Sequence, residues 1–269
     1  MNFAIILAFL FGIGSLFGWV LELFYRRFFS SANPERRWIN PGFLAGPYLP
    51  LYGFSLCALF LMSYINLSFI DNKILRKICL FIVMAIIVTV IEYIAGLIFI
   101  TNMKIKLWDY ENEWGNIKGI ICPRYSFYWT LLSAGYYFLI HPRILNALYW
   151  LSKHLLFSFF IGFFYGVLYL DFWYSMSISN KIKSYVDDKE IIIRYEELKT
   201  FIRQKGIDAK ENPRFFFGFR MDRTSFSQNL KEFVDKEVKK RKDFMDETHK
   251  IFDEAKEKVG EYIEGKIKK

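Results

Sequence analysis

The sequence predicts an all-α, polytopic membrane protein with about five transmembrane helices and a cytoplasmic helical tail. Hydrophobic residues make up 54% of the chain and aromatic residues 20%, far above the usage of soluble proteins. The apolar residues are concentrated in residues 1–176, whereas residues 177–269 are rich in charge. The chain therefore divides into a transmembrane domain, 1–176, and a charged helical tail, 177–269.

The apolar segments of the first domain each have nearly the length that a bilayer crossing needs, about 20 residues. Pro47 and Pro50 break the start of the second segment. Residues 143–153 are too short and too mixed in composition to cross, so we expect a loop or an interfacial turn there. The predicted transmembrane helices are 3–25, 48–66, 75–101, 121–141 and 154–176.

Lys and Arg are most frequent in the connections after the first and third predicted helices. Cytoplasmic connections carry an excess of these residues. We therefore place the N-terminus outside the cell membrane, and these two connections and the tail in the cytoplasm. The net charge of +9 fits a protein held against anionic lipid. The first apolar run is too long for a signal peptide, so we expect it to be a retained anchor helix.

Two stretches of the chain repeat one another at a spacing of 76 positions, with no gap. Each follows an apolar run that carries an acid and leads into another apolar run. This indicates a duplicated helix–loop–helix unit over about 3–66 and 75–141; chance similarity among aromatic-rich segments is the alternative. Trp38, Asn40, Pro47 and Tyr52 recur as Trp114, Asn116, Pro123 and Tyr128.

Three acids lie within the apolar helices, where a carboxylate is costly unless it faces protein, water or a partner. They either line a polar or proton pathway, or are each neutralised and hold the bundle together. These acids are Glu22, Glu92 and Asp171.

The surroundings of these acids bear on both interpretations. Gly14, Gly18 and Glu22 share one helix face, and glycines at this spacing let another helix approach closely. Arg26 follows Glu22 by one turn, in the favourable orientation for an ion pair. Ser175 follows Asp171 by one turn.

The segment 40–53 contains too many Gly and Pro residues to be a regular helix. Irregular backbone beside a membrane span persists only where protein or a water-filled cavity satisfies its amides and carbonyls. Such a segment either binds an ion through its backbone or forms a tight interfacial turn packed on its neighbours.

Motifs of hydrolytic, redox and nucleotide-binding enzymes are absent from the sequence, so we expect neither an enzyme nor a cofactor. The three histidines are scattered, and we expect no metal site. Cys57, Cys79 and Cys122 lie in or beside apolar runs without a CxxC pair, which indicates core thiols. The mixed charge of the tail argues against nucleic acid as a partner.

The tail contains an aromatic-basic stretch, residues 213–220, that either dips into lipid headgroups or packs on the tail's own helices. A long charged helix follows it to the C-terminus. Its apolar positions form an interrupted stripe, so this helix could contact a soluble partner or another copy of the chain.

Several motifs resemble the putative ABC-transporter type IV (CmpB-like) family of bacterial integral membrane proteins, over about residues 5–176. In that family, as the resemblance implies, basic residues follow the first Asn and the second loop Gly; here Pro41 and Ile120 stand there, so an anion-binding role does not carry over. The motifs are Gly18-Trp19-Val20-Leu21-Glu22, Asn40-x-Gly42-Phe43-Leu44-x-Gly46-Pro47-x-x-Pro50-x-Tyr52-Gly53, Trp108-Asp109-Tyr110, Asn116-x-x-Gly119-x-Ile121-Cys122 and Asp171-x-x-x-Ser175.

The resemblance implies a permease-like membrane component of a transport system, which would need a separate ATPase because this chain carries no nucleotide-binding motif. A non-transporting scaffold or regulator that recruits a soluble protein through its tail is the alternative. An intramembrane enzyme ranks last. The partners expected are the lipid bilayer, an ATPase or other soluble subunit, and a further copy of the chain.

Overall fold

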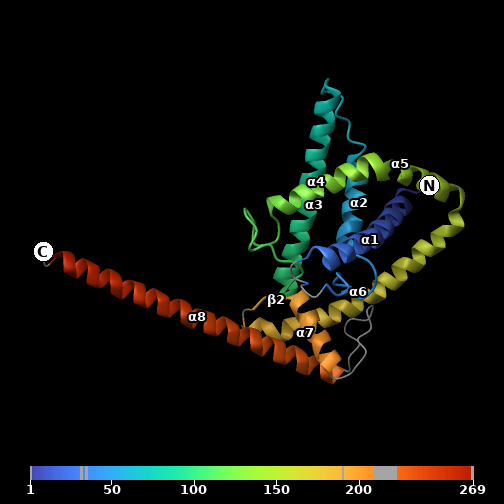
Figure 1. The fold of residues 1–269 in the computed structure, drawn as a ribbon. Coiled ribbons are helices and arrows are strands. Elements are labelled where there is room, and N and C mark those ends of the chain that lie inside the picture. Colours follow the sequence, from blue (N-terminus) through green and yellow to red (C-terminus); the bar gives the residue numbers. More distant parts are fainter. Residues whose placement is uncertain (1, 31–32, 34–35, 190, 209–222, 268–269) are drawn as a thin grey trace.

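The computed structural model describes residues 2–30, 33, 36–189, 191–208 and 223–267. It is mostly helical, with a bundle from which one long helix projects (Figure 1). The aromatic-basic stretch 213–220 lies outside the described residues. In chain order the elements are α1 (Phe3–Phe28), α2 (Pro50–Met62), α3 (Lys73–Met103), β1 (Ile105–Lys106), α4 (Pro123–Gly135), the π-helical η1 (Tyr136–Ile140), α5 (His141–Lys153), the 3₁₀ turn η2 (Leu155–Phe157), α6 (Ser158–Val186), the 3₁₀ turn η3 (Asp187–Lys189), β2 (Ile193–Arg194), α7 (Tyr195–Asp208) and α8 (Arg223–Ile267).

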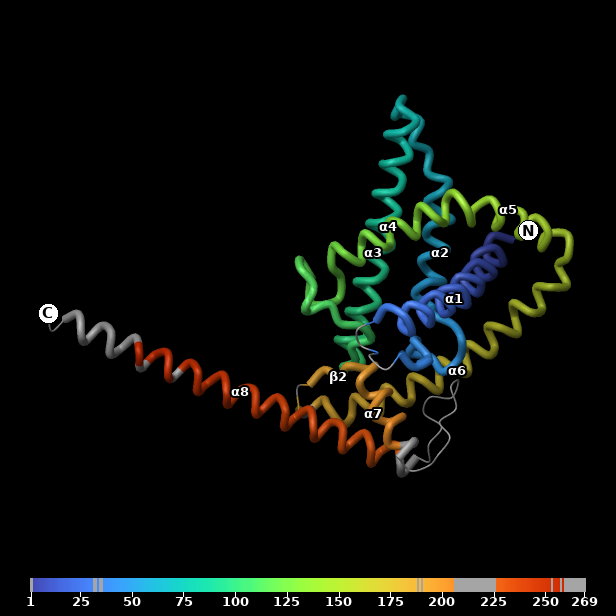
Figure 2. The backbone as a smooth tube through the Cα atoms, in the orientation of Figure 1, coloured from blue at the N-terminus to red at the C-terminus, as the bar shows by residue number. Residues whose placement is uncertain are grey.

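The helices alternate in direction between two ends of the bundle (Figure 2). α1, α3 and α6 run toward the end that holds α7, whereas α2 and the α4–α5 segment run away from it. Three stretches in the described part of the chain are long and apolar enough to cross a bilayer: Phe3–Phe28, Lys73–Met103 and Leu155–Val186. α2 has 13 residues, which at the helical rise span about 20 Å. Five crossings therefore stay a prediction.

The expectation of a loop at 143–153 is wrong, because α5 continues the helix that begins at α4. Pro142 cannot donate the backbone hydrogen bond of a helix interior, and a π-helical turn, η1, precedes it. The His141 amide bonds to the Tyr136 carbonyl in this wider turn. Ile144, Leu148 and Leu151 are buried on one face of α5, so the mixed composition that suggested a loop is that of a helix with one apolar face.

The second and fifth predicted helices also have different bounds. α2 ends at Met62 rather than 66, and α6 continues past 176 to Val186. Ile178, Ile182 and Val186 recur at helical spacing and are buried against the tail, which explains why the helix continues. The first part of the tail is therefore packed on the bundle.

A short parallel sheet adds a second link between tail and bundle. β1, directly after α3, pairs with β2 in the tail, with Ile105 opposite Ile193 and Lys106 opposite Arg194. Ile105 and Ile193 are both almost fully buried. The tail is thus held by backbone hydrogen bonds as well as by side chains.

The duplication seen in the sequence has a limited counterpart in the helices. α2 begins with Pro50 and α4 with Pro123, both at the first turn, where proline is favoured. These starts are 73 positions apart, whereas the matching residues are 76 apart, and Pro47 lies in the loop before α2. The duplicated unit stays a prediction.

The close helix contact expected at Gly14 and Gly18 is present, and α2 is the partner of α1. A Cβ atom added to Gly18 would lie 2.1 Å from Cγ of Tyr52, and one added to Gly14 would lie 2.9 Å from Cβ of Leu56. The absence of side chains at these positions therefore sets how closely α1 and α2 pack, and it places Tyr52 beside Glu22.

We expect Gly18→Ala to lower the thermal midpoint of the detergent-solubilised protein, because the new methyl group overlaps the Tyr52 ring. The free energy of unfolding should fall by about 1–3 kcal/mol. Gly162→Ala in α6 is the matched control, since nothing lies within 4 Å of a Cβ atom there. It should leave the midpoint unchanged or raise it. Equal midpoints for the two variants would contradict the close packing of α1 on α2.

Candidate functional site: the polar end of the helix bundle

Asn40 organises the irregular loop between α1 and α2. Its Oδ1 accepts a hydrogen bond from Trp19 Nε1 at 2.8 Å and another from the Gly42 amide at 3.2 Å. Its Nδ2 donates to the carbonyls of Leu44 (3.1 Å) and Ala45 (3.0 Å). Because the side chain is 92% buried, these bonds replace water as the partner of the loop backbone.

Asp171 reaches the same loop from α6. Its two carboxylate oxygens accept hydrogen bonds from the amides of Ala45 (3.0 Å) and Gly46 (2.7 Å) and from the Tyr48 hydroxyl (2.5 Å). Ser175, one turn later, donates to it at 3.1 Å, so the predicted pair is present. An ionised acceptor of several donors makes strong hydrogen bonds, and Asp171 thereby ties α6 to the loop.

Glu22 and Arg26 form the ion pair that their spacing predicts, with Arg26 Nε 3.1 Å from Glu22 Oε1. The Tyr52 hydroxyl donates to the other oxygen of Glu22 at 3.0 Å. Arg26 also contacts the tail, because its Nη1 lies 2.6 Å from Oε2 of Glu196 in α7. The guanidinium therefore bridges a bundle acid and a tail acid.

Glu92 lies in α3 and is 98% buried. It accepts hydrogen bonds from the Tyr110 hydroxyl (3.2 Å) and from Trp129 Nε1 (3.0 Å). Gly96, one turn later, allows the loop to approach α3: an added Cβ atom would lie 2.3 Å from Cγ2 of Ile120. Both oxygens of this acid thus have donors from the second half of the bundle.

Aromatic side chains join the surroundings of Glu22 and Glu92. The ring of Tyr52 lies 5.1 Å from that of Trp129, centroid to centroid. Tyr110 stacks on Tyr125 at 4.1 Å, and the hydroxyls of Tyr125 and Tyr25 are 2.9 Å apart. These contacts connect α1 and α2 to α4, so the two acids belong to one network of side chains.

Helix α7 covers the first loop through its basic and aromatic residues. Lys199 Nζ donates to the carbonyls of Asn40 (3.0 Å) and Gly42. Arg203 Nη1 donates to the Trp38 carbonyl at 2.8 Å. Burial, together with the nearby Arg26, lowers the pKa of Lys199 to about 7. A neutral amine keeps two N–H donors, enough for both carbonyls.

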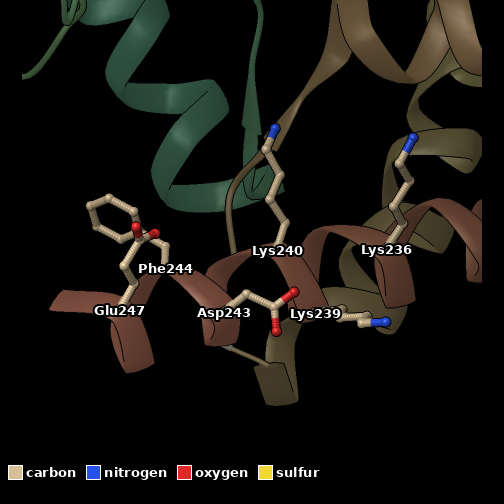
Figure 3. A pocket seen from close by; sticks show the side chains of 6 residues that line it. All are labelled: Lys236, Lys239, Lys240, Asp243, Phe244 and Glu247. Atoms are coloured by element: carbon tan, nitrogen blue, oxygen red, sulfur yellow. The ribbon is translucent and has the colours of Figure 1, made fainter. Parts of the chain in front are cut away.

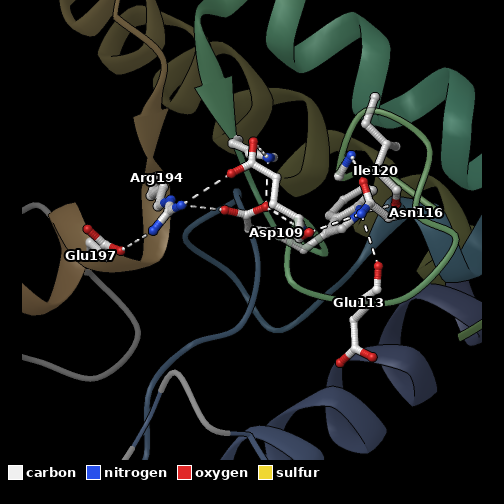
Figure 4. Close-up of polar contacts among 10 residues, drawn as sticks. Asp109, Glu113, Asn116, Ile120, Arg194 and Glu197 are labelled. Atoms are coloured by element: carbon white, nitrogen blue, oxygen red, sulfur yellow. Dashed lines mark hydrogen bonds and ion pairs between the residues drawn. The ribbon is translucent and has the colours of Figure 1, made fainter. Parts of the chain in front are cut away.

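The second loop, between α3 and α4, is fixed by Arg194 of the tail (Figure 4). Arg194 lies 2.8 Å from Oδ2 of Asp109, whose Oδ1 pairs with Lys106 at 2.6 Å. Asn116 Nδ2 donates to the Glu113 carbonyl at 2.9 Å and, as for Asn40, its Oδ1 accepts a loop amide, here that of Gly119. Gly119 has a φ of +64°, a conformation that favours glycine.

The other predicted loop residues do not lie together at one place in the structure. Trp108 Nε1 donates to the Ile120 carbonyl at 2.8 Å. Trp38 packs edge-on against Phe24, with ring centroids 5.6 Å apart. Trp114 is 86% exposed and faces outward, whereas Tyr128, 39% exposed, packs edge-on against Tyr125 with ring centroids 5.7 Å apart.

The arrangement braces helices and loops more directly than it binds a free ion. Each of the three acids accepts hydrogen bonds from at least two groups of the protein. Within the described residues, no group of three or more His, Cys, Asp or Glu side chains could hold a metal ion. The three cysteines are free thiols.

Most of the donors that satisfy these acids and loops could not be predicted from the sequence. Tyr48 and Trp129 are ordinary aromatic residues of an aromatic-rich chain, whereas Tyr110 belongs to the Trp108-Asp109-Tyr110 motif but was not assigned as a partner of Glu92. Glu196 and Lys199 are charged residues of the kind found on any solvent-exposed helix face. Their partners, Arg26 and Asn40, lie more than 150 positions away in the sequence. Apart from Tyr110, no local sequence pattern marks these residues.

The fold is that of a mostly helical protein with three candidate membrane spans among the described residues, and its loops and tail are gathered at one end of the helix bundle. Residues 9–176 match the family described as "Putative ABC-transporter type IV". The match covers more than half of the chain, so the chain belongs to this family. No curated protein and no solved structure shows a significant match to it.

We expect Asp171→Asn to release the first loop, because the amide side chain has no charge and offers one acceptor oxygen instead of two. Hydrogen exchange of the Ala45 and Gly46 amides should accelerate roughly 10- to 100-fold, as loss of charged hydrogen bonds implies. Asp187→Asn, at an exposed position after the same helix, is the control. Unchanged exchange in Asp171→Asn would contradict the anchoring role.

We expect the stability of α7 docking to rise with pH above about 7. The pKa of Lys199 is lower in the folded protein than in the unfolded chain, so the unfolded state binds more protons between about 7 and 10.5. The free energy of unfolding should rise by up to about 1.4 kcal/mol for each pH unit in this range. Thermal midpoints from pH 6.5 to 9.5 test this.

Lys199→Met is the comparison for this pH series, because its side chain has similar length and does not titrate. The difference in midpoint between wild type and Lys199→Met should grow as the pH rises. A difference that stays constant with pH would show that Lys199 does not titrate in this range.

Proposed function

We propose that this chain is the permease-like membrane component of a bacterial transport system and works with a separate ATPase subunit. The observation that carries the proposal is the docking of the tail on both loops, through Arg203 and Lys199 on the first and Arg194 on the second. Membership of the ABC-transporter type IV family supports the transport class.

The docked tail offers a direct mechanical route from a cytoplasmic partner to the membrane helices. A partner that moves α7 would act on the loop through Lys199, on α1 through Arg26, and on β1 through the paired strand. The abundance of Lys and Arg in these loops supports a cytoplasmic location for this end of the bundle. In this proposal the buried acids brace the bundle while it moves.

A copurification experiment tests the need for a partner. The tagged full-length chain would be crosslinked in its bacterial host, purified in mild detergent and analysed by mass spectrometry for proteins present in equal amount. An unrelated polytopic protein from the same cells is the control. We expect a nucleotide-binding subunit, and ATP hydrolysis by the purified complex in liposomes.

The second candidate function is a membrane scaffold or regulator that does not transport. The exposed length of α8, including Phe244 and Phe252, favours it because such a surface suits protein contacts. Recovery of a partner that is not an ATPase, in an amount equal to that of the chain itself, would support this function and contradict the permease proposal.

We expect Glu22→Gln and Glu92→Gln each to lower stability by about 1–3 kcal/mol, because an amide cannot accept at both of its polar atoms. ATP hydrolysis by the assembled complex should stay within about threefold of wild type, since the acids brace rather than conduct. Glu254→Gln, at an exposed position, is the control. Lost hydrolysis at unchanged stability would assign the acids to a transport pathway instead.

A further inference from the structure

Exposed aromatic side chains surround the last turns of α1, a helix long and apolar enough to cross a bilayer. Trp38 packs edge-on against Phe24 and Phe28, with ring centroids 5.6 Å and 6.2 Å apart. Phe24 is 50%, Phe28 54% and Trp38 40% exposed. Tryptophan is enriched where the hydrocarbon core of a bilayer meets the lipid headgroups, so Trp38 marks the headgroup level at this end of α1.

Three arginines gather around Trp38. Cζ of Arg27 lies 5.2 Å from the centroid of the Trp38 ring, and Arg203 Nη1 donates to the Trp38 carbonyl. Arg37 directly precedes Trp38 in the sequence. Burial, together with the nearby Arg37, lowers the pKa of Arg203, so these two like charges repel each other. We call Arg27, Arg37, Trp38 and Arg203 the arginine–tryptophan cluster.

The acids nearby do not neutralise this cluster. Residues 26–40 contain four arginines and one glutamate, and both Glu22 and Glu196 are partners of Arg26. Within the part of the chain that the structure describes, neither Arg27 nor Arg203 forms an ion pair with an acid. Nε of Arg203 is buried there without a hydrogen-bond partner. The cluster therefore has positive charge and a donor left for an anion.

We propose that the arginine–tryptophan cluster binds the phosphate group of an anionic phospholipid in the cytoplasmic leaflet. Guanidinium groups suit phosphate because their planar N–H donors match its oxygens, and the cytoplasmic leaflet carries anionic lipid. The position of the cluster selects a lipid over soluble phosphate, because acyl chains of a lipid held there lie against the exposed rings of Phe24 and Phe28. The inference rests on the cytoplasmic location given under the proposed function, but not on transport.

A second group of basic residues, on α8, lacks this excess of positive charge. Lys236, Lys239 and Lys240 line a shallow surface pocket together with Asp243 and Glu247 (Figure 3). An anion in this pocket would meet carboxylates as well as ammonium groups. The charge around Trp38 is therefore the better match to a lipid phosphate.

Lipid binding by the full-length protein in detergent tests the proposal, with bound molecules counted by native mass spectrometry. The probes are dioctanoyl phosphatidylglycerol, dioctanoyl phosphatidylcholine and inorganic phosphate. Wild type should bind the phosphatidylglycerol more tightly than the phosphatidylcholine, and inorganic phosphate should not displace it. Arg27→Gln and Arg203→Gln should each weaken phosphatidylglycerol binding about fivefold, as the loss of one basic charge near a lipid surface implies. Arg143→Gln, at an exposed position of α5, is the control and should bind as wild type does.

Three results would overturn the proposal: equal binding of the two lipids, an equal loss of binding in Arg27→Gln and Arg143→Gln, or displacement of the phosphatidylglycerol by inorganic phosphate. The last would assign the cluster to a soluble anion. Arg203 also holds α7 on the first loop, so thermal midpoints without lipid show whether its variant is folded, and Arg27→Gln decides if it is not. The assay needs neither a partner nor ATP, so its outcome is independent of the copurification result.

Discussion

The polypeptide backbone of the loop between α1 and α2 sets the constraint on which this structure depends. A non-helical segment at the end of a membrane bundle needs a hydrogen-bond partner for each buried peptide group, because lipid offers none. Asn40 from within the loop, Asp171 from α6 and Lys199 from α7 supply these partners. Each comes from a different part of the chain, so the loop is held by partners from both the bundle and the tail.

The buried charged side chains have a structural role, because they provide the hydrogen-bond and ion-pair partners that the loop and the helices need. Asp171 is needed where loop amides lack carbonyl partners, and Arg26 is needed where Glu22 and Glu196 meet. A buried ion pair that loses one partner leaves an uncompensated charge, which costs several kcal/mol. The tail is consequently docked on the end of the bundle, through contacts of α7 and β2 with α1 and with both loops.

The parts of the structure that follow local rules could be predicted from the sequence, and the rest could not. The pair Glu22 and Arg26, one turn apart, and the close contact at Gly18 follow from helical spacing alone. The helix over residues 143–153 was missed because this segment was judged only on whether it could cross a bilayer, whereas Ile144, Leu148 and Leu151 bury one face of α5 against the bundle. Tail docking was missed because Lys199 meets its partners 159 positions away, beyond the reach of any local pattern.

A double-mutant cycle between Arg26 and Glu196 tests the central claim, that the tail is energetically coupled to the membrane helices. Hydrogen exchange of the α7 amides would be compared among wild type, Arg26→Gln, Glu196→Gln and the double variant in one detergent. The side chains are 12% and 18% exposed, so we predict a coupling free energy of about 1–3 kcal/mol. Effects that add within about 0.5 kcal/mol would contradict the claim and leave the tail uncoupled from the bundle.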